Sequence, residues 1–209
     1  MFNFYNICDP TTGTGPPLRP GGTVLTDRAL SVCGFPPGAR LLDVGCGLGS
    51  TVQHLMRGTD FRVTGLDPSA ALLEGARNRA PELSLVKGRA EALPFPDRSQ
   101  DGLLCECVLS LLDDPQRALG EFSRVLRPGG CLILSDLYEQ SGDPQTDQRA
   151  MDSPLLDLGF TTLLWEDHTP LLREMAAQLI LAGASPADCC SPGLIRPGYY
   201  LLAARLQTT

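Results

Sequence analysis

The chain has 209 residues, of which 43% are hydrophobic and 20% are charged, and its formal net charge is −7. This composition is ordinary for a globular protein, and the length suits one domain with a substantial core. The negative charge argues against a general binder of nucleic acid or anionic membranes, because attraction to phosphate needs a basic surface. No apolar stretch approaches the about 20 residues of a membrane span, and residues 1–20 lack the layout of a signal peptide. We therefore expect a cytoplasmic protein with no membrane contact.

In chain order, the pattern first predicts an irregular arm over residues 1–22, which is rich in Gly, Pro and Thr. A helix follows over 23–33 and ends at Gly34, before two prolines. Strands and helices then alternate as far as Ser135. The predicted strands cover 40–44, 61–66, 83–87, 102–107 and 131–135, and the predicted helices cover 50–56, 70–79 and 115–125.

Beyond Ser135 the pattern loosens, and residues 139–152 are predicted to form a short insertion on the substrate side. Strands that alternate with helices indicate βαβ units and a parallel, doubly wound sheet. The last strand follows a connection without a helix, so we expect it to enter the sheet antiparallel. The sequence predicts one α/β domain over 1–209, with a mostly parallel, Rossmann-like sheet of seven strands. The last predicted elements are a helix over 153–158, a strand over 161–165, a helix over 171–181, a loop over 188–197 and a strand over 199–206.

Eight cysteines are scattered along the chain without a C-x-x-C pair. A disulfide framework is unusual in a cytosolic chain of this size, and a zinc site would need paired spacings. Several of these cysteines lie in apolar runs, where cysteine packs as a small hydrophobe. We therefore expect no metal site, and packing roles for most of Cys8, Cys33, Cys46, Cys105, Cys107, Cys131, Cys189 and Cys190.

Three glycines follow the first predicted strand at every second position, and Asp43 stands two residues before the first of them. A buried strand that breaks into glycines predicts a tight turn, where the backbone can adopt φ > 0 or touch a ligand. Backbone N–H groups bared by this turn, together with the next helix, would favour a carboxylate or phosphate. The turn of Gly45, Gly47 and Gly49 therefore predicts a site for a nucleoside-type cofactor.

The spacing of the glycines separates two classes of cofactor. In the dinucleotide fingerprint G-x-G-x-x-G, Ser50 would occupy the third glycine position, and Asp43 would stand where the strand is usually apolar. Both departures oppose a nicotinamide-dependent dehydrogenase. The D-x-G-x-G-x-G form resembles motif I of class I S-adenosylmethionine-dependent methyltransferases. This resemblance implies that the three glycines line the methionine end of that cofactor and that Asp43 orients its amino group.

Asp67 ends the second predicted strand, 18 residues after Gly49. Ligands of open α/β sheets bind outside the carboxyl ends of the strands, and a carboxylate there can accept hydrogen bonds from both ribose hydroxyls. Asp-Pro-Ser is also a good helix start, but Ser69 can fill the capping role. We therefore expect Asp67 to bind the ribose of the cofactor.

Two further blocks extend the resemblance. Residues 86–97, VKGRAEALPFPD, resemble the "GDAExLPFPD" block of the methyltransferase group that contains the ubiquinone and menaquinone C-methyltransferases (methyltransferase type 11). Residues 124–132, RVLRPGGCL, resemble the "RVLKPGGxL" block of the same group. With motif I and Asp67, the resemblance covers residues 38–138 and implies transfer of a methyl group from S-adenosylmethionine to a small molecule. It also implies that the cofactor contacts Cys46, Pro68, Ala90, Glu91 and Cys107.

One position departs from the group. The acid after Gly88, which usually bonds the adenine amino group, is replaced by Arg89. A guanidinium has only donors, so it cannot accept a hydrogen bond from an exocyclic amine. Either Glu91 or a backbone carbonyl takes this role, or Arg89 stacks on the ring or points to solvent. The backbone N–H of Ala90 is a partner for a ring nitrogen.

Candidate proton-transfer groups follow the later strands, namely Glu106, Asp136 and His168. Asp136 can equally cap a loop, and a lone histidine such as His168 is more often structural. Strand alternation would place Cys105 and Cys107 on one face and Glu106 on the other. Two thiols on one face suggest a soft methyl acceptor, such as a thiol, arsenic or selenium species, although they can equally pack as core residues.

Methyl transfer needs little beyond positioning and exclusion of water, since proximity alone is worth about 7–11 kcal/mol. The alternative function is a regulatory module that binds the cofactor without catalysis, and the lack of an obligatory catalytic residue does not separate the two. The acidic chain and the short segment between the fifth and sixth strands favour a small molecule over RNA or DNA as the acceptor.

Overall fold

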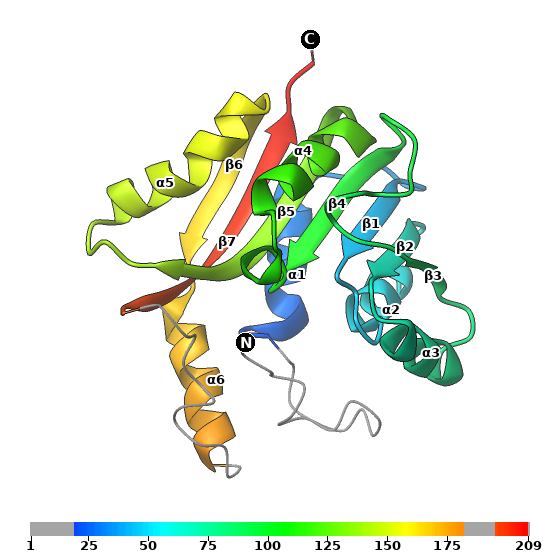
Figure 1. The fold of residues 1–209 in the computed structure, drawn as a ribbon, viewed down its shortest axis with the longest axis horizontal. Helices are drawn as coiled ribbons and strands as arrows, with labels where there is room; N and C mark the ends of the chain where they lie inside the picture. The colour runs from blue at the N-terminus through cyan, green and yellow to red at the C-terminus, as the bar shows by residue number, and fades with distance from the viewer. Residues whose placement is uncertain (1–18, 182–194, 209) are drawn as a thin grey trace.

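The computed structural model describes residues 19–181 and 195–208, which form seven strands in one sheet (Figure 1). The arm before residue 19, most of the loop predicted over 188–197, and Cys8, Cys189 and Cys190 lie outside the described residues. The strand order is β3-β2-β1-β4-β5-β7-β6. The strands are β1 (Arg40–Val44), β2 (Arg62–Asp67), β3 (Ser84–Lys87), β4 (Gln100–Glu106), β5 (Leu126–Glu139), β6 (Phe160–Asp167) and β7 (Pro197–Leu206).

The first five strands pair in parallel, and β7 lies antiparallel between β5 and β6. The predicted Rossmann-like sheet with an antiparallel last strand is therefore confirmed. The chain order reverses between β1 and β4, since β2 and β3 lie on one side of this pair and the later strands on the other. Ligands of such sheets bind at the carboxyl edge beside this switch point.

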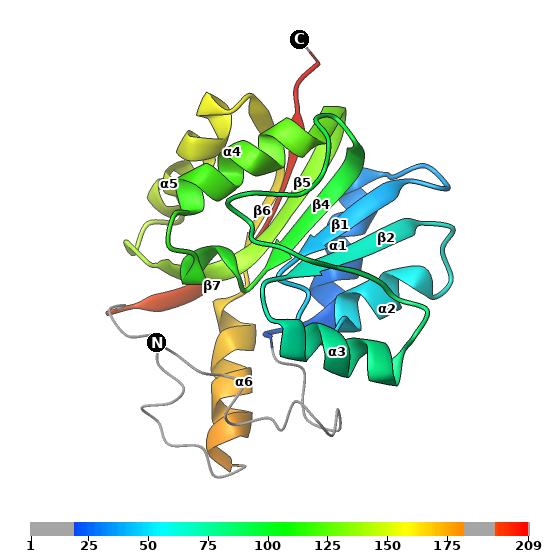
Figure 2. The same cartoon turned by 45° about the vertical axis from the view of Figure 1, so that its right-hand side comes forward.

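Helices cover both faces of the sheet (Figure 2). One buried cluster, here called the α1 face, receives side chains from α1, α2, α3 and α6. The opposite cluster, the α4 face, receives side chains from α4 and α5. None of the helices in the described residues is long and apolar enough to cross a membrane. The helices are α1 (Gly22–Cys33), α2 (Ser50–Met56), α3 (Ala70–Arg79), α4 (Pro115–Val125), α5 (Pro144–Asp157) and α6 (Thr169–Leu181), with a short 3₁₀ turn, η2 (Leu109–Leu111).

Local sequence explains why α4 forms where it does. Asp114 is its N-cap and accepts a hydrogen bond from the Arg117 N–H at 3.0 Å, and Pro115 occupies the first helical position. Both residues favour a helix start. Four apolar side chains at helical spacing then bury one face of the helix against the sheet, namely Ala118, Leu119, Phe122 and Val125.

Strand β5 is much longer than the predicted strand over 131–135. Residues 127–130 were predicted to end the preceding helix, but they belong to the strand as an irregularity. The register with β4 shifts between the pairs Gln100↔Leu126 and Gly102↔Cys131, and Gly129 has φ +83°. Extra residues on one strand are the mark of a bulge. The Pro-Gly-Gly signal therefore marks a bulge inside the strand.

Helix α5 is longer than the short helix predicted over 153–158 and extends back to Pro144, into the segment 139–152. The helix starts at Pro144, where the side chain of the N-cap Asp143 accepts a hydrogen bond from the Thr146 N–H at 3.1 Å. Pro154 lies in the last part of the helix. Proline is common in a first helical turn and costly in an interior, so Pro154 is unusual in this position.

Candidate active site

The glycine turn joins β1 to α2 at the switch point of the sheet. Gly45, Gly47 and Gly49 have φ values of +77°, +52° and +75°, so the predicted need for left-handed backbone is confirmed. A Cβ on Gly45 would lie 2.2 Å from Val108 Cγ2, in the loop after β4. Glycine therefore lets this turn pack directly against the neighbouring loop.

Four N–H groups of the turn are engaged within the protein and are not bared as the sequence predicted. The N–H groups of Gly45 and Cys46 both donate to Leu66 O, at 2.7 and 3.0 Å. The Gly47 N–H donates to Asp67 Oδ2 at 2.9 Å, and the Gly49 N–H donates to Cys46 O. Three of these donors hold the turn against the end of β2 and the fourth closes the turn on itself, so these four N–H groups are not free to bind a ligand.

Asp43 is the most unusual side chain beside this turn. It is 3% exposed, and its Oδ2 has no hydrogen-bond partner among the described residues. The pKa of Asp43 is raised to about 8, by burial first and then by the negative charges of Glu106 and Asp67, while the positive charge of Arg19 opposes them. A buried acceptor among acids, with one arginine to offset them, is suited to a ligand group that is a cation and a donor.

Asp67 lies at the predicted place, but its oxygens are already engaged. Oδ2 accepts from the Gly47 N–H at 2.9 Å, and Oδ1 accepts from the Ser69 N–H at 2.8 Å. Ser69 caps α3 as predicted, since its hydroxyl accepts from the Leu72 N–H. A carboxylate has about four acceptor positions, so each oxygen of Asp67 keeps capacity for a ligand hydroxyl.

Glu106 forms a buried network with the chain segment before α1, which the sequence did not predict. Arg19 makes an ion pair with Glu106 Oε2, and the Thr26 hydroxyl donates to Oε1 at 2.8 Å. Arg19 also donates to the hydroxyls of Thr26 and Thr51, at 2.8 and 2.6 Å. The network joins α1, α2 and the end of β4. No local pattern could have revealed it, because Arg19 and Glu106 are 87 residues apart in the sequence.

Cys105, in β4, and Cys107, just after it, lie on opposite faces of the sheet, so the prediction of a same-face thiol pair is wrong. Cys105 belongs to the buried cluster of the α4 face, and Cys107 packs on the cluster of the α1 face. Cys107 has φ +57°, which breaks the strand alternation. Its sulfur lies 3.1 Å from Tyr199 Oη, and burial raises the pKa of the thiol to about 12. The observation that suggested a soft methyl acceptor is therefore lost.

Asp136, near the end of β5, organises the short turn that follows β4. It is 2% exposed, and its carboxylate accepts hydrogen bonds from the Ser110 N–H at 2.9 Å and the Ser110 hydroxyl at 2.6 Å. Burial raises the pKa of Asp136 against these hydrogen bonds. Asp136 therefore caps the turn at Ser110, at the rim of the site, which is one of the two roles that the sequence suggested for it.

His168 lies farther along the same edge, between β6 and α6. Its Nε2 is 3.1 Å from Glu166 Oε2, and Glu166 in turn pairs with Arg28 of α1. The His168 N–H donates to Tyr199 O, which connects β6 to β7. The other histidine, His54, pairs with Asp27 at the surface, and its Nε2 is 2.7 Å from Asp27 Oδ1.

The remaining predicted contacts divide between core and surface. The Cys46 sulfur packs toward Gly65 of β2, and Ala90 is 4% exposed in the cluster of the α4 face. Pro68 is exposed at the rim. Arg89 points outward with its side chain 58% exposed and pairs with Glu91 and Asp113, at 3.0 Å each.

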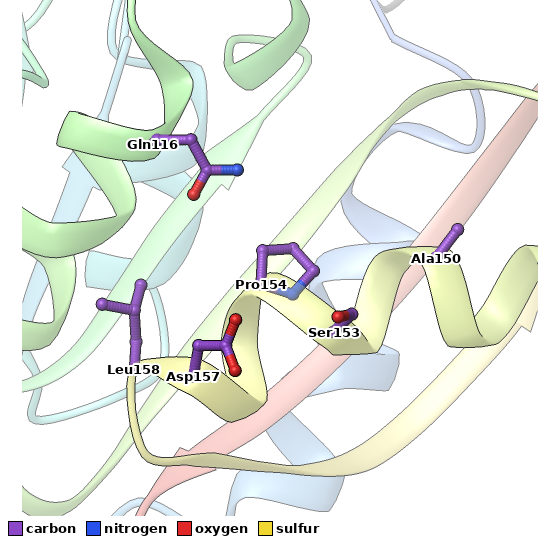
Figure 3. A pocket seen from close by; sticks show the side chains of 6 residues that line it. All are labelled: Gln116, Ala150, Ser153, Pro154, Asp157 and Leu158. Atoms are coloured by element: carbon purple, nitrogen blue, oxygen red, sulfur yellow. The ribbon is translucent and has the colours of Figure 1, made fainter.

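A groove of about 480 Å³ lies away from these residues, between α4 and α5 (Figure 3). Gln116 from α4 faces it on one side, and α5 provides most of the other side. None of its lining residues was predicted as a site residue. The predicted residues Asp43, Asp67 and Glu106 lie instead at the carboxyl ends of β1, β2 and β4, so we place the candidate site at this edge of the sheet. The groove is lined by Gln116, Ala150, Ser153, Pro154, Asp157 and Leu158.

Comparison with known proteins matches residues 42–134 to the family described as "Methyltransferase domain". A demethylmenaquinone methyltransferase of Renibacterium salmoninarum is 35% identical over 112 residues, which are 53% of this chain and 46% of the relative. A fatty-acid O-methyltransferase of Mycolicibacterium smegmatis is 34% identical over 164 residues, which are 76% of this chain and 57% of the relative. The chain spans about half the length of the curated relatives it matches.

Among solved structures, the [4+2]-cyclase SpnF superposes with a TM-score of 0.73 at 26% identity and covers 89% of this chain and 82% of the other. A putative sarcosine dimethylglycine methyltransferase from Galdieria sulphuraria gives a TM-score of 0.70 at 20% identity, covering 89% and 84%. The second likeness concerns the fold alone. The matched blocks, the strand order and the glycine turn agree with one another: residues 42–134 form a methyltransferase domain of the class I S-adenosylmethionine-dependent family, in the group that includes the demethylmenaquinone methyltransferases.

Proposed function

We propose that the chain transfers a methyl group from S-adenosylmethionine to a small-molecule acceptor at the carboxyl edge of the sheet. The observation that carries the proposal is the orphaned, buried Oδ2 of Asp43 beside the glycine turn. The surplus of acid there fits the amino group and the positive charge of this cofactor. When bound, S-adenosylmethionine supplies a methyl group activated by its sulfonium.

The chain's own residues would hold the cofactor at two points of this edge. Asp43 would accept a hydrogen bond from the ammonium of the methionine part, and Asp67 would accept from the ribose hydroxyls through its remaining acceptor positions. Gly45 keeps the backbone free of a side chain where Val108 already packs closely. The side chains present therefore fit the cofactor.

On the acceptor side, we infer different roles for the three candidate acids and bases. Both oxygens of Glu106 are engaged by Arg19, Thr26 and Thr51, which suits an anchoring role. The raised pKa of Asp136, beside the Ser110 hydroxyl, suits a group that holds or accepts a proton near the acceptor.

We also infer that the chain works as a single domain in the cytoplasm, on a small acceptor and without nucleic acid or membrane. The shared sheet of the described residues and the net charge of −7 support this. His168, held by Glu166, is a candidate for orienting the acceptor at the far rim.

Calorimetry with S-adenosylmethionine and with NAD tests the cofactor. We expect binding of S-adenosylmethionine, and the Asp43→Ala variant should bind it at least about tenfold more weakly, because the ammonium loses its buried acceptor. Glu82→Ala, at an exposed position before β3, is the matched control. Binding of NAD with no response to S-adenosylmethionine would overturn the proposal.

Turnover tests the reaction. Incubation with S-adenosylmethionine and a panel of small metabolites should yield S-adenosylhomocysteine for at least one acceptor. Since one structural relative is named a cyclase, the fold alone does not define the reaction. Tight binding with no S-adenosylhomocysteine across a broad panel would favour the regulatory module.

A further inference from the structure

We propose that Glu91 reads the adenine amino group of the bound cofactor through its Oε2, in place of the acid that the family carries after Gly88. The inference rests on the proposed function, because it assigns a residue to the base end of the same cofactor. It would make Glu91 a specificity-determining residue that distinguishes an amino from an oxo group on the purine.

The first support is an unsatisfied acceptor. Glu91 is 8% exposed, and its Oε1 accepts a hydrogen bond from Arg89 Nη2 at 3.0 Å. Its Oε2 is buried and has no partner among the described residues. A buried carboxylate oxygen without a donor is costly, so this atom is suited to a donor that a ligand brings.

The second support is the position of the loop after β3. The Gly88 N–H donates to Asp67 O at 3.2 Å, which holds the start of this loop beside the candidate ribose ligand. The Ala92 N–H donates to Arg89 O at 3.2 Å, so residues 89–92 form a tight turn. Glu91 lies within this turn, three residues after Gly88, whose N–H bonds to Asp67.

The third support is the difference in charge between the two orphaned oxygens. Among the described residues Asp43 makes no direct ion pair, and it lies among acids, which suits a cationic donor. Glu91 is already paired with the guanidinium of Arg89, so its charge is offset. The remaining oxygen therefore suits a neutral donor, such as the exocyclic amine of adenine, better than a second cation. The two acids match the two chemically different amino groups of one ligand.

Arg89 acts as a positioning residue in this arrangement. It bridges Glu91 and Asp113, at 3.0 Å each, and so joins the loop after β3 to the loop after η2. This bridge through Arg89 Nη2 explains why an arginine can stand where the family has an acid: it fixes the carboxylate that takes over the acceptor role.

The test compares binding of S-adenosylhomocysteine with that of S-inosylhomocysteine, in which a 6-oxo group replaces the amine. The intact chain should prefer the adenosyl ligand by about tenfold or more, because the oxo group faces a carboxylate oxygen. In Glu91→Gln the amide can donate, so the preference should shrink to near unity or reverse. Asp113→Asn is the matched control, since it alters the other partner of Arg89 and should keep the preference.

The outcomes separate the two proposals. If the intact chain binds neither ligand, the proposed function fails. If it binds S-adenosylhomocysteine and Glu91→Gln keeps the full preference, the function stands and the role of Glu91 is refuted. If thermal unfolding shows that Glu91→Gln is not folded, Glu91→Asp replaces it in the test. This variant keeps the carboxylate but withdraws it by one methylene. It should also reduce the preference, and an unchanged preference in that variant would refute the role equally.

Discussion

Asp43 is a carboxylate that the fold buries, surrounds with other acids and leaves without a donor on Oδ2. Its folded pKa of about 8 lies above the ordinary value near 4, so the folded protein binds the extra proton. The stability associated with that proton is present below pH about 4 and is lost as pH rises toward 8. The ligand-free protein thus becomes less stable as pH rises toward 8, where Asp43 is ionised and can bind a cationic ligand.

We predict that Asp43→Asn stabilises the ligand-free protein at alkaline pH. The amide does not titrate, so its advantage over the parent should grow between pH 5 and pH 9, by on the order of a few kcal/mol. Urea unfolding at pH 5, 7 and 9 measures it. The exposed Asp60→Asn serves as the control and should run parallel to the parent. An advantage of Asp43→Asn that is the same at pH 5 and 9 would contradict the assigned pKa.

Gly45 and Gly38 offer a second comparison between single residues. Their φ values are +77° and +76°, but a Cβ on Gly45 would strike Val108, whereas nothing lies within 4 Å of one on Gly38. Gly38→Ala should cost about 1 kcal/mol from backbone strain. Gly45→Ala should cost that plus about 1–3 kcal/mol from overpacking.

Val108→Ala should recover part of the loss in Gly45→Ala and none of the loss in Gly38→Ala. Thermal or urea unfolding measures these differences for Gly38→Ala and Gly45→Ala, each alone and each combined with Val108→Ala, with Val108→Ala alone as the reference. Equal costs at the two glycines would show that the turn after β1 relaxes away from the loop after β4.

At the scale of elements, the Arg19–Glu106 ion pair fastens the start of α1 to the end of β4. The side chains of Arg19 and Glu106 are 15% and 2% exposed. Removing one partner of a buried pair leaves the other charge uncompensated and costs about 3–5 kcal/mol. We predict a loss of this size for Arg19→Met, measured by urea unfolding.

The double variant Arg19→Met with Glu106→Gln should be more stable than Arg19→Met alone, because the second change removes the stranded charge. The hydroxyls of Thr26 and Thr51 donate to different oxygens of Glu106, so in the glutamine variant one of them can still donate to the amide oxygen and the other can accept from the amide nitrogen. If the double variant loses the sum of the two single losses, the pair is not coupled and the fastening role is wrong.

The elements near the glycine turn could be predicted from sequence because their signals are local. Capping residues, helical spacing and glycines define β1, α2 and α3 within a few residues of each boundary. Asp43 and Glu91 were likewise predicted because motif I and the block over 86–97 fix their places, and Asp67 because it ends the second predicted strand.

The remaining differences arise where distant residues decide. Arg19 gave no signal in its arm, since its partner lies 87 residues away. Cys107 leaves the strand pattern because its backbone adopts φ +57° to meet Tyr199. Gly129 forms a bulge only because β4 lies beside it. Period and propensity describe neighbours in sequence, so they do not predict these contacts.

At the scale of the whole molecule, the sheet depends on β7, which pairs with β5 on one side and β6 on the other. A chain ended after Gly159 would leave the buried residues Leu132, Ile133 and Leu134 of β5 along an open edge. Exposed apolar edges pair with other chains. We predict that this shortened chain is recovered as aggregate, whereas a chain ended after Leu206 stays in the supernatant after centrifugation.

The place of β7 also has a consequence during synthesis. Strand β7 is made after β6 but lies between β5 and β6 in the sheet, so β6 cannot join the sheet until β7 has left the ribosome. The glycine turn, Asp43 and Asp67 can assemble on the nascent chain before β7 is made. The surroundings of Asp136 are complete only when Tyr200, its register partner in β7, has paired with β5. Because such non-local pairing is slow, translation would deliver the cofactor end of the site first and the acceptor end last. An interrupted message would yield a polypeptide that a cell's proteases can recognise as unfinished.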